Sequence, residues 1–121
     1  MKANEIRIGN YIEIGNKITQ VGEIFDDGIT TELDKHQYEY LISDINSIPL
    51  TEDWLIQLGF DWDIYYQGYT EGNWVINPNL KNGFKINYGK RRNDPIIWDI
   101  RFVHQLQNLY FALTEKELEI R

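Results

Sequence analysis

Two carboxylates with a spacing that could bind a cation lie in the stretch Asp61-Trp62-Asp63. Residues two apart on a β-strand point to the same face, so both carboxylates could contact one hard cation. The residues that follow lack the glycine and the distal glutamate of a calcium-binding loop. The alternative interpretation is a solvated strand face opposite the core. We therefore expect no resident metal ion and no cofactor.

The two histidines, His36 and His104, are the candidates for acid–base chemistry. His104 follows Asp99 and Arg101, and a histidine that acts as a general base needs such a carboxylate to orient it. No serine or cysteine nucleophile motif accompanies it, and the chain contains no cysteine. The alternatives are a histidine satisfied by a neighbour at a helix start, and a surface loop residue for His36. Because the glycines do not form a phosphate-binding loop either, we expect a protein that is not an enzyme.

Acidic side chains form two groups that could contact a partner protein, at residues 23–34 and 52–63. Carboxylates presented together can occupy a basic groove that normally binds nucleic acid, and such binding weakens as salt is added. The residues that we expect to take part are Asp26, Asp27, Glu32, Asp34, Asp61 and Asp63.

A basic loop and a tyrosine-rich turn are the features that could bind nucleic acid. Lys90, Arg91 and Arg92 are consecutive cations in a predicted hairpin loop, and Tyr65 and Tyr69 border a turn that contains glycine. Cations that contact phosphates and aromatic rings that stack on bases bind single strands together. The alternatives are a solubilising loop tip and aromatic rings that fill a small core.

The charge of the whole chain favours a basic protein as the partner. The 121 residues include 12 Lys+Arg and 19 Asp+Glu, which gives a formal net charge of -7. A general nucleic-acid-binding protein needs a basic footprint, so nucleic acid is the less favoured partner. No run of apolar residues is long enough to span a membrane, and the first residues lack the apolar segment of a signal peptide. We expect a cytoplasmic protein without membrane contact.

Residues 1–50 have the pattern of short strands separated by turns. Gly15-Asn16 predicts a tight hairpin, and Asp26-Asp27-Gly28 predicts a second turn. Strands at intervals of 8–10 residues are typical of small barrels. We therefore expect a small N-terminal lobe, similar to a β-barrel of the SH3 type.

Residues 51–121 predict a short helix, an antiparallel sheet and a C-terminal helix, so the chain belongs to the α+β class. Thr51 is a suitable N-cap for the first helix, and Gly59 is a suitable stop. The strands that follow alternate aromatic and polar residues, which predicts one aromatic sheet face. Apolar residues at helical spacing after residue 102 predict the helix that covers this face. The aromatic face is expected to comprise Trp62, Tyr66, Phe84, Tyr88, Trp98 and Phe102, with Tyr110 on the covering helix.

Three segments of the chain resemble a set of short proteins from Bacteroidota, their phages and their mobile elements. The resemblance is carried by residues 1–10, 48–52 and 104–114, with Glu117-Leu118 following the last of them. It implies a cytoplasmic bacterial or phage setting, and it implies no activity, cofactor or catalytic residue.

The function that these features predict is that of a non-enzymatic interaction protein of bacterial or phage origin. It would act as an acidic modulator or inhibitor of a host system that handles nucleic acid. The alternative is a nucleic-acid-binding module that uses the basic loop at residues 90–92 and the nearby aromatic rings.

Overall fold

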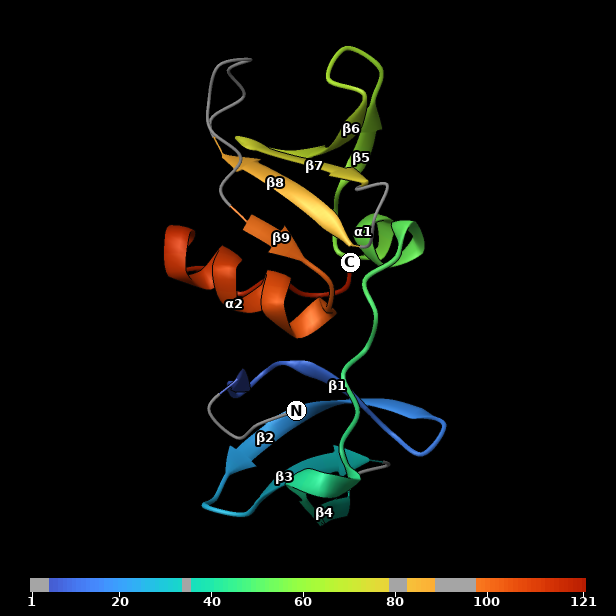
Figure 1. The fold of residues 1–121 in the computed structure, drawn as a ribbon. Helices are drawn as coiled ribbons and strands as arrows, with labels where there is room; N and C mark the ends of the chain where they lie inside the picture. The colour runs from blue at the N-terminus through green and yellow to red at the C-terminus, as the bar shows by residue number, and fades with distance from the viewer. Residues whose placement is uncertain (1–4, 34–35, 79–82, 89–97) are drawn as a thin grey trace. The chain divides into compact units, whose positions relative to one another are not determined.

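The computed structural model describes residues 5–33, 36–78, 83–88 and 98–121, and Figure 1 shows their arrangement into helices and strands. The protein is α+β, with two antiparallel sheets and a C-terminal helix. The chain divides into two compact units. The first unit combines Met1–Pro49 with Phe102–Glu117, and the second combines Leu50–Arg101 with Leu118–Arg121. No helix among the described residues is long and apolar enough to cross a membrane.

The first unit contains a four-stranded sheet in which each strand pairs with the next along the chain. Its strands are β1 (Tyr11–Ile14), β2 (Lys17–Ile24), β3 (Gly28–Leu33) and β4 (His36–Leu41), and the short 3-10 helix η2 (Ile42–Asp44) follows them. Gly15, at a φ of 60°, and Asn16 connect β1 to β2, as their turn signal predicts. The core of this unit comprises Ile6, Ile12, Val21, Ile29 and Ile45.

The antiparallel strand series is confirmed, but no closed barrel is found. In the described part of the chain, β1 and β4 are the two edges of the sheet, and no ladder joins them. The outer side of β1 is bonded to Asn46 instead, because Glu13 and Asn46 exchange two backbone hydrogen bonds of 3.0 and 2.8 Å. The spacing of short strands indicates neighbours in a meander, but it does not determine whether the last strand pairs with the first. The closure of an SH3-like barrel therefore stays a prediction.

The C-terminal helix α2 (Val103–Thr114) belongs to the first unit, whereas the sequence placed it in a second lobe at residues 51–121. Its buried positions include the polar residues His104 and Gln107 beside the apolar Val103 and Leu106. Helical periodicity identifies a buried face, but it does not identify the surface on which that face packs. The chain passes from the first unit to the second after Pro49, next to the predicted boundary at residue 50, and the difference lies in the assignment of α2.

Amide side chains connect α2 to the segment that leads into β1. The Gln107 side chain is fully buried, and its Oε1 accepts a hydrogen bond of 2.8 Å from the backbone N–H of Tyr11. Asn10 is also fully buried, and its Nδ2 donates to Asn108 Oδ1 at 2.8 Å. Asn108 in turn donates to the backbone carbonyl of Glu5 at 2.9 Å. These directional bonds assign α2 to the first sheet.

The second unit contains a short helix and a five-stranded sheet, again with strands paired in chain order (Figure 1). The elements are α1 (Glu52–Gln57), β5 (Asp61–Asp63), β6 (Gly68–Glu71), β7 (Trp74–Pro78), β8 (Phe84–Tyr88) and β9 (Trp98–Ile100). Its most deeply buried side chains include Leu55, Phe60, Ile76 and Ile86. The short helix and an antiparallel sheet are present as the sequence predicts, but β6 lies where the sequence predicts part of the turn around Tyr69.

The strand register places most of the predicted aromatic residues at positions of one sheet face. Trp62 pairs with Tyr69, Tyr69 with Ile76, Ile76 with Ile86, and Ile86 with Trp98. Phe84 and Tyr88 share this face because they lie two positions from Ile86. Two residues that were expected on this aromatic face lie elsewhere. Tyr66 lies in the turn after β5, and Phe102 belongs to the first unit as the N-cap of α2.

Replacing Thr51 with alanine is expected to lower the free energy of unfolding by about 1 kcal/mol. Thr51 is the N-cap of α1, and its Oγ1 accepts a hydrogen bond of 3.2 Å from the backbone N–H of Trp54. Alanine removes this acceptor, whereas the control Thr51→Ser keeps it. Urea denaturation followed by tryptophan fluorescence measures both variants. Equal midpoints for the alanine and serine variants would show that the cap contributes nothing.

Candidate interaction surface

The acidic turn between β2 and β3 is exposed. Asp26 and Asp27 occupy this turn, which is closed by a hydrogen bond of 2.8 Å from the Phe25 N–H to the Gly28 carbonyl. Glu32 lies in β3 opposite Gln37. The predicted site residue Asp34 lies outside the described residues. Asp26 and Asp27 therefore share the exposed turn, Glu32 is placed by its register in β3, and the role of Asp34 stays a prediction.

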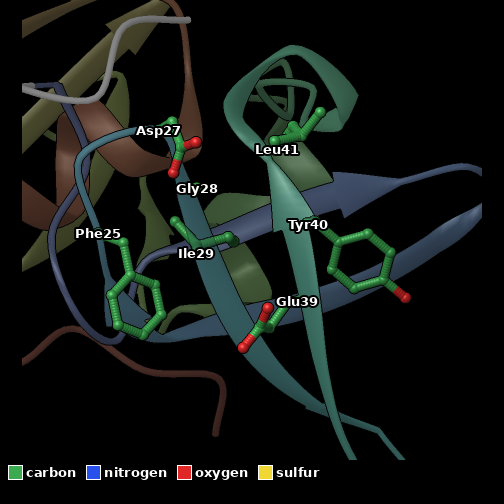
Figure 2. Close-up of a pocket in the computed structure, with 7 residues that line it drawn as sticks. All are labelled: Phe25, Asp27, Gly28, Ile29, Glu39, Tyr40 and Leu41. Atoms are coloured by element: carbon green, nitrogen blue, oxygen red, sulfur yellow. The ribbon is translucent and has the colours of Figure 1, made fainter.

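A pocket of about 500 Å³ lies beside this turn, on the strands β3 and β4. Figure 2 shows the side chains that line it, and we call it the β4 pocket. It is lined by Phe25, Asp27, Gly28, Ile29, Glu39, Tyr40 and Leu41. All of these residues belong to the first unit.

The pairing of β3 with β4 explains which side chains of the β4 pocket are accessible. Ile29 pairs with Tyr40 on the core face, and the Ile29 side chain is fully buried. Glu39 and Leu41 flank Tyr40 along β4, so they point to the opposite face. In Figure 2 the Tyr40 ring and the Glu39 carboxylate extend from opposite sides of β4. Glu39 and Leu41 are both exposed.

Gly28 keeps the floor of the β4 pocket open. A Cβ atom at this position would lie 2.5 Å from the backbone oxygen of Tyr40, which is closer than side chains normally approach. The glycine therefore permits the close pairing of β3 with β4 and adds no side chain beside Leu41. Phe25 stands at the rim with 48% of its surface exposed, and Leu41 is 55% exposed. Two exposed apolar side chains thus line the same pocket as Asp27 and Glu39.

Asp61 and Asp63, the predicted pair of carboxylates, make separate local interactions in β5. Asp61 is 3.4 Å from the guanidinium group of Arg121. The Oδ1 atom of Asp63 accepts hydrogen bonds from the backbone N–H groups of Tyr65 at 2.8 Å and Tyr66 at 3.4 Å, an Asx turn. Within the described residues, no group of three or more metal-ligating side chains is found.

The two predicted interaction tyrosines have different environments. Tyr65 is exposed, and its ring contacts that of Tyr66 edge-on at 4.8 Å. Tyr69 is buried in β6, and burial together with the neighbouring Glu52 carboxylate raises the pKa of its hydroxyl group. Tyr69 therefore packs inside the second unit, whereas Tyr65 lies at the surface. Lys90, Arg91 and Arg92 lie outside the described residues.

His104 is buried without a hydrogen-bond partner for either ring nitrogen among the described residues. Its ring stacks on that of Phe102, with the centroids 5.9 Å apart and the planes inclined by 17°. Burial lowers the pKa of His104, and the nearby Glu5 carboxylate acts in the opposite direction. The ring therefore has no bonded carboxylate to orient it within the described residues, and its environment favours the neutral form.

Sequence reasoning missed Phe25, Glu39 and Leu41 as surface residues of a common pocket. The alternation of Glu39, Tyr40 and Leu41 is visible in the sequence and places Glu39 and Leu41 on one strand face. It does not reveal that the end of β2 carries Phe25 to the same place. That proximity depends on the turn at Asp26 and Asp27 and on the pairing of β3 with β4.

Comparison with known proteins finds no family model, no curated protein and no solved structure that matches this chain.

Proposed function

We propose that this chain is a non-enzymatic interaction protein that binds a basic, partly apolar protein segment at the β4 pocket. The observation that carries the proposal is the grouping of exposed Phe25 and Leu41 with Asp27 and Glu39 around one pocket. Apolar side chains in a partly enclosed site supply binding free energy, and the carboxylates select the charge of the partner. The net charge of -7 adds long-range attraction for a basic protein.

Proteins that handle nucleic acid are suitable partners because they carry basic surfaces. A protein that covers such a surface with carboxylates would compete with nucleic acid for it. We therefore propose a modulator or inhibitor of a nucleic-acid-handling system, in the bacterial or phage setting that the three resembling segments imply. The exposed Asp26 lies next to Asp27 and extends the acidic surface of the β4 pocket.

The Glu39→Lys variant is expected to retain partner proteins from a bacterial lysate about tenfold less than the wild-type chain at low ionic strength. The reversed charge repels the basic segment, and the wild-type interaction itself is expected to weaken as salt is added. Affinity capture followed by quantitative mass spectrometry measures both effects.

The matched control is Glu119→Lys, which makes the same charge change at an exposed position of the second unit. It is expected to capture the same proteins as the wild-type chain. Phe25→Ala tests the apolar part of the β4 pocket and is expected to weaken capture at every salt concentration. If Glu39→Lys and Glu119→Lys behave alike, the β4 pocket is not the binding site and the proposal fails.

The exposed Tyr65 supports a second candidate function, binding of single-stranded nucleic acid with the basic residues 90–92. The Tyr65→Ala variant and the Lys90→Glu variant would both weaken a gel shift of single-stranded DNA or RNA. Absence of a shift with the wild-type chain at low salt excludes this function.

A further inference from the structure

We propose that the partner segment binds as an additional β-strand on the outer edge of β4, with lysine or arginine facing Glu39 and an apolar side chain beside Leu41. The inference rests on the proposed function and specifies the form of the bound segment. It is an extended peptide in which basic and apolar residues share one face.

The hydrogen-bond pattern shows which backbone groups of β4 point outward. The Ile42 N–H donates to the Asp27 carbonyl at 3.0 Å, so Asp27 and Ile42 form a hydrogen-bonded pair. Hydrogen-bonded and non-hydrogen-bonded pairs alternate along an antiparallel ladder. Gly28 and Leu41 are the next pair in the register, so they form a non-hydrogen-bonded pair. By the same alternation Ile29 and Tyr40 form a hydrogen-bonded pair, and Thr30 and Glu39 form a non-hydrogen-bonded pair.

It follows that Leu41 and Glu39 direct their backbone N–H and C=O groups away from β3. β4 is the edge of the sheet, and among the described residues none bonds to the backbone of Glu39 or Leu41 from the outer side. Unpaired groups on a sheet edge are a template for a further strand. The opposite edge differs, because Asn46 already pairs with Glu13 there.

The side chains at this edge select the partner. An added strand would form its hydrogen-bonded pairs with Glu39 and Leu41, and the residues opposite them would share the face of the β4 pocket. The first of these residues faces the Glu39 carboxylate, and the second lies opposite the exposed apolar Leu41. A second copy of this chain pairing through its own β4 would bring carboxylates toward each other. Charge complementarity therefore favours a basic segment from another protein over self-pairing.

The test uses a synthetic eight-residue peptide that repeats lysine, threonine, valine and threonine. Lysine and valine then share one face, and the threonines occupy the other. If the peptide adds as a strand through Glu39 and Leu41, the lysine and valine N–H groups bond to β4 and those of threonine point away. Isothermal titration with the full chain measures the affinity of the peptide and of two N-methylated forms.

Methylation of the lysine and valine amides is expected to weaken binding about tenfold or more, and methylation of the threonine amides is expected to leave it nearly unchanged. Equal affinities for the parent and both methylated peptides would show that the segment binds the β4 pocket without pairing, which overturns the inference. Binding that weakens equally with either methylation overturns it as well.

A variant of the chain gives a second, independent measurement. Leu41 has a φ of -72°, which proline can adopt, and its outward N–H makes no bond to β3. Leu41→Pro is therefore expected to fold, with unchanged circular dichroism, and to bind the peptide more weakly than the control Leu41→Ala. Equal binding by the two variants contradicts pairing at this residue.

The outcomes separate the inference from the proposed function. If no peptide binds while lysate capture still depends on Glu39, strand addition is wrong and the proposed function remains. If capture does not depend on Glu39 either, both are wrong. Concentration-dependent dimers that Leu41→Pro abolishes would show that the edge binds a second copy of this chain, and this result also overturns the inference.

Discussion

The Gln107→Leu variant is expected to lose about 2 kcal/mol of its free energy of unfolding. The Gln107 side chain is fully buried, its Oε1 accepts from the Tyr11 N–H at 2.8 Å, and its Nε2 donates to the Gly9 carbonyl at 3.1 Å. Leucine preserves the volume but removes the acceptor that Gln107 Oε1 provides to the buried Tyr11 N–H. The Gly9 carbonyl keeps a second donor, because Gln20 Nε2 also bonds to it at 3.1 Å. The loss of stability is therefore expected to arise mainly at the Tyr11 N–H.

Urea denaturation followed by far-ultraviolet circular dichroism measures this loss, and amide hydrogen exchange locates it at Tyr11. All four tryptophans lie in the second unit, so circular dichroism, to which both units contribute, is the probe of choice for a change in the first unit. The control is Gln20→Leu, which removes the exposed donor to the same carbonyl and is expected to change stability by less than about 0.5 kcal/mol. Equal losses in the two variants would show that burial of Gln107 has no special effect.

The His104→Leu variant is expected to be more stable than the wild-type chain at neutral pH by about 1 kcal/mol. The reason is that His104 buries two ring nitrogens with no hydrogen-bond partner among the described residues, and leucine fills a similar volume without polar atoms. Equilibrium denaturation at pH 7 measures the difference. A destabilised variant would indicate that the imidazole makes a favourable polar interaction.

The pH dependence of stability provides a separate test of the same side chain. Because burial lowers the pKa of folded His104, the unfolded chain binds a proton near the ordinary histidine value of about 6.5, before the folded chain does. The free energy of unfolding is therefore expected to fall as the pH drops through about 6.5 and to level off below the folded pKa. His104→Leu should remove this part of the pH dependence. The His36→Gln variant measures the contribution of the only other histidine, and an unchanged pH profile for His104→Leu would contradict the lowered pKa.

Gln107 and His104 illustrate why the sequence predicted the helix but not its packing. They lie three positions apart on α2, so helical periodicity places both near the buried face together with Val103 and Leu106. Periodicity does not distinguish a buried amide that bonds to a distant backbone group from a buried imidazole with no hydrogen-bond partner among the described residues. The Gln107 side chain bonds to Tyr11, 96 positions earlier, and this bond is a property of the folded chain only.

Only part of the candidate site was predictable, because a local pattern does not show which distant segments meet in the fold. The turn at Asp26 and Asp27 was predictable because a following glycine and two turn-forming residues act over neighbouring positions. Tyr65 and Tyr69 were predicted together, yet only Tyr65 is exposed. An aromatic ring is compatible with both a core and an interface, so its residue type alone does not assign its environment.

The sequence by itself determined the α+β class, most of the antiparallel strands, the capped start of α1, the helical face of α2 and the acidic charge. Each of these depends on composition or on residues a few positions apart. Only the tertiary structure decided that α2 belongs with the first sheet and that Phe25, Glu39 and Leu41 line one pocket. It also decided that the outer edge of β4 carries no paired strand in the described residues. These properties depend on which distant segments pair and on which backbone hydrogen bonds remain unpaired after folding, and neither is encoded in a local pattern.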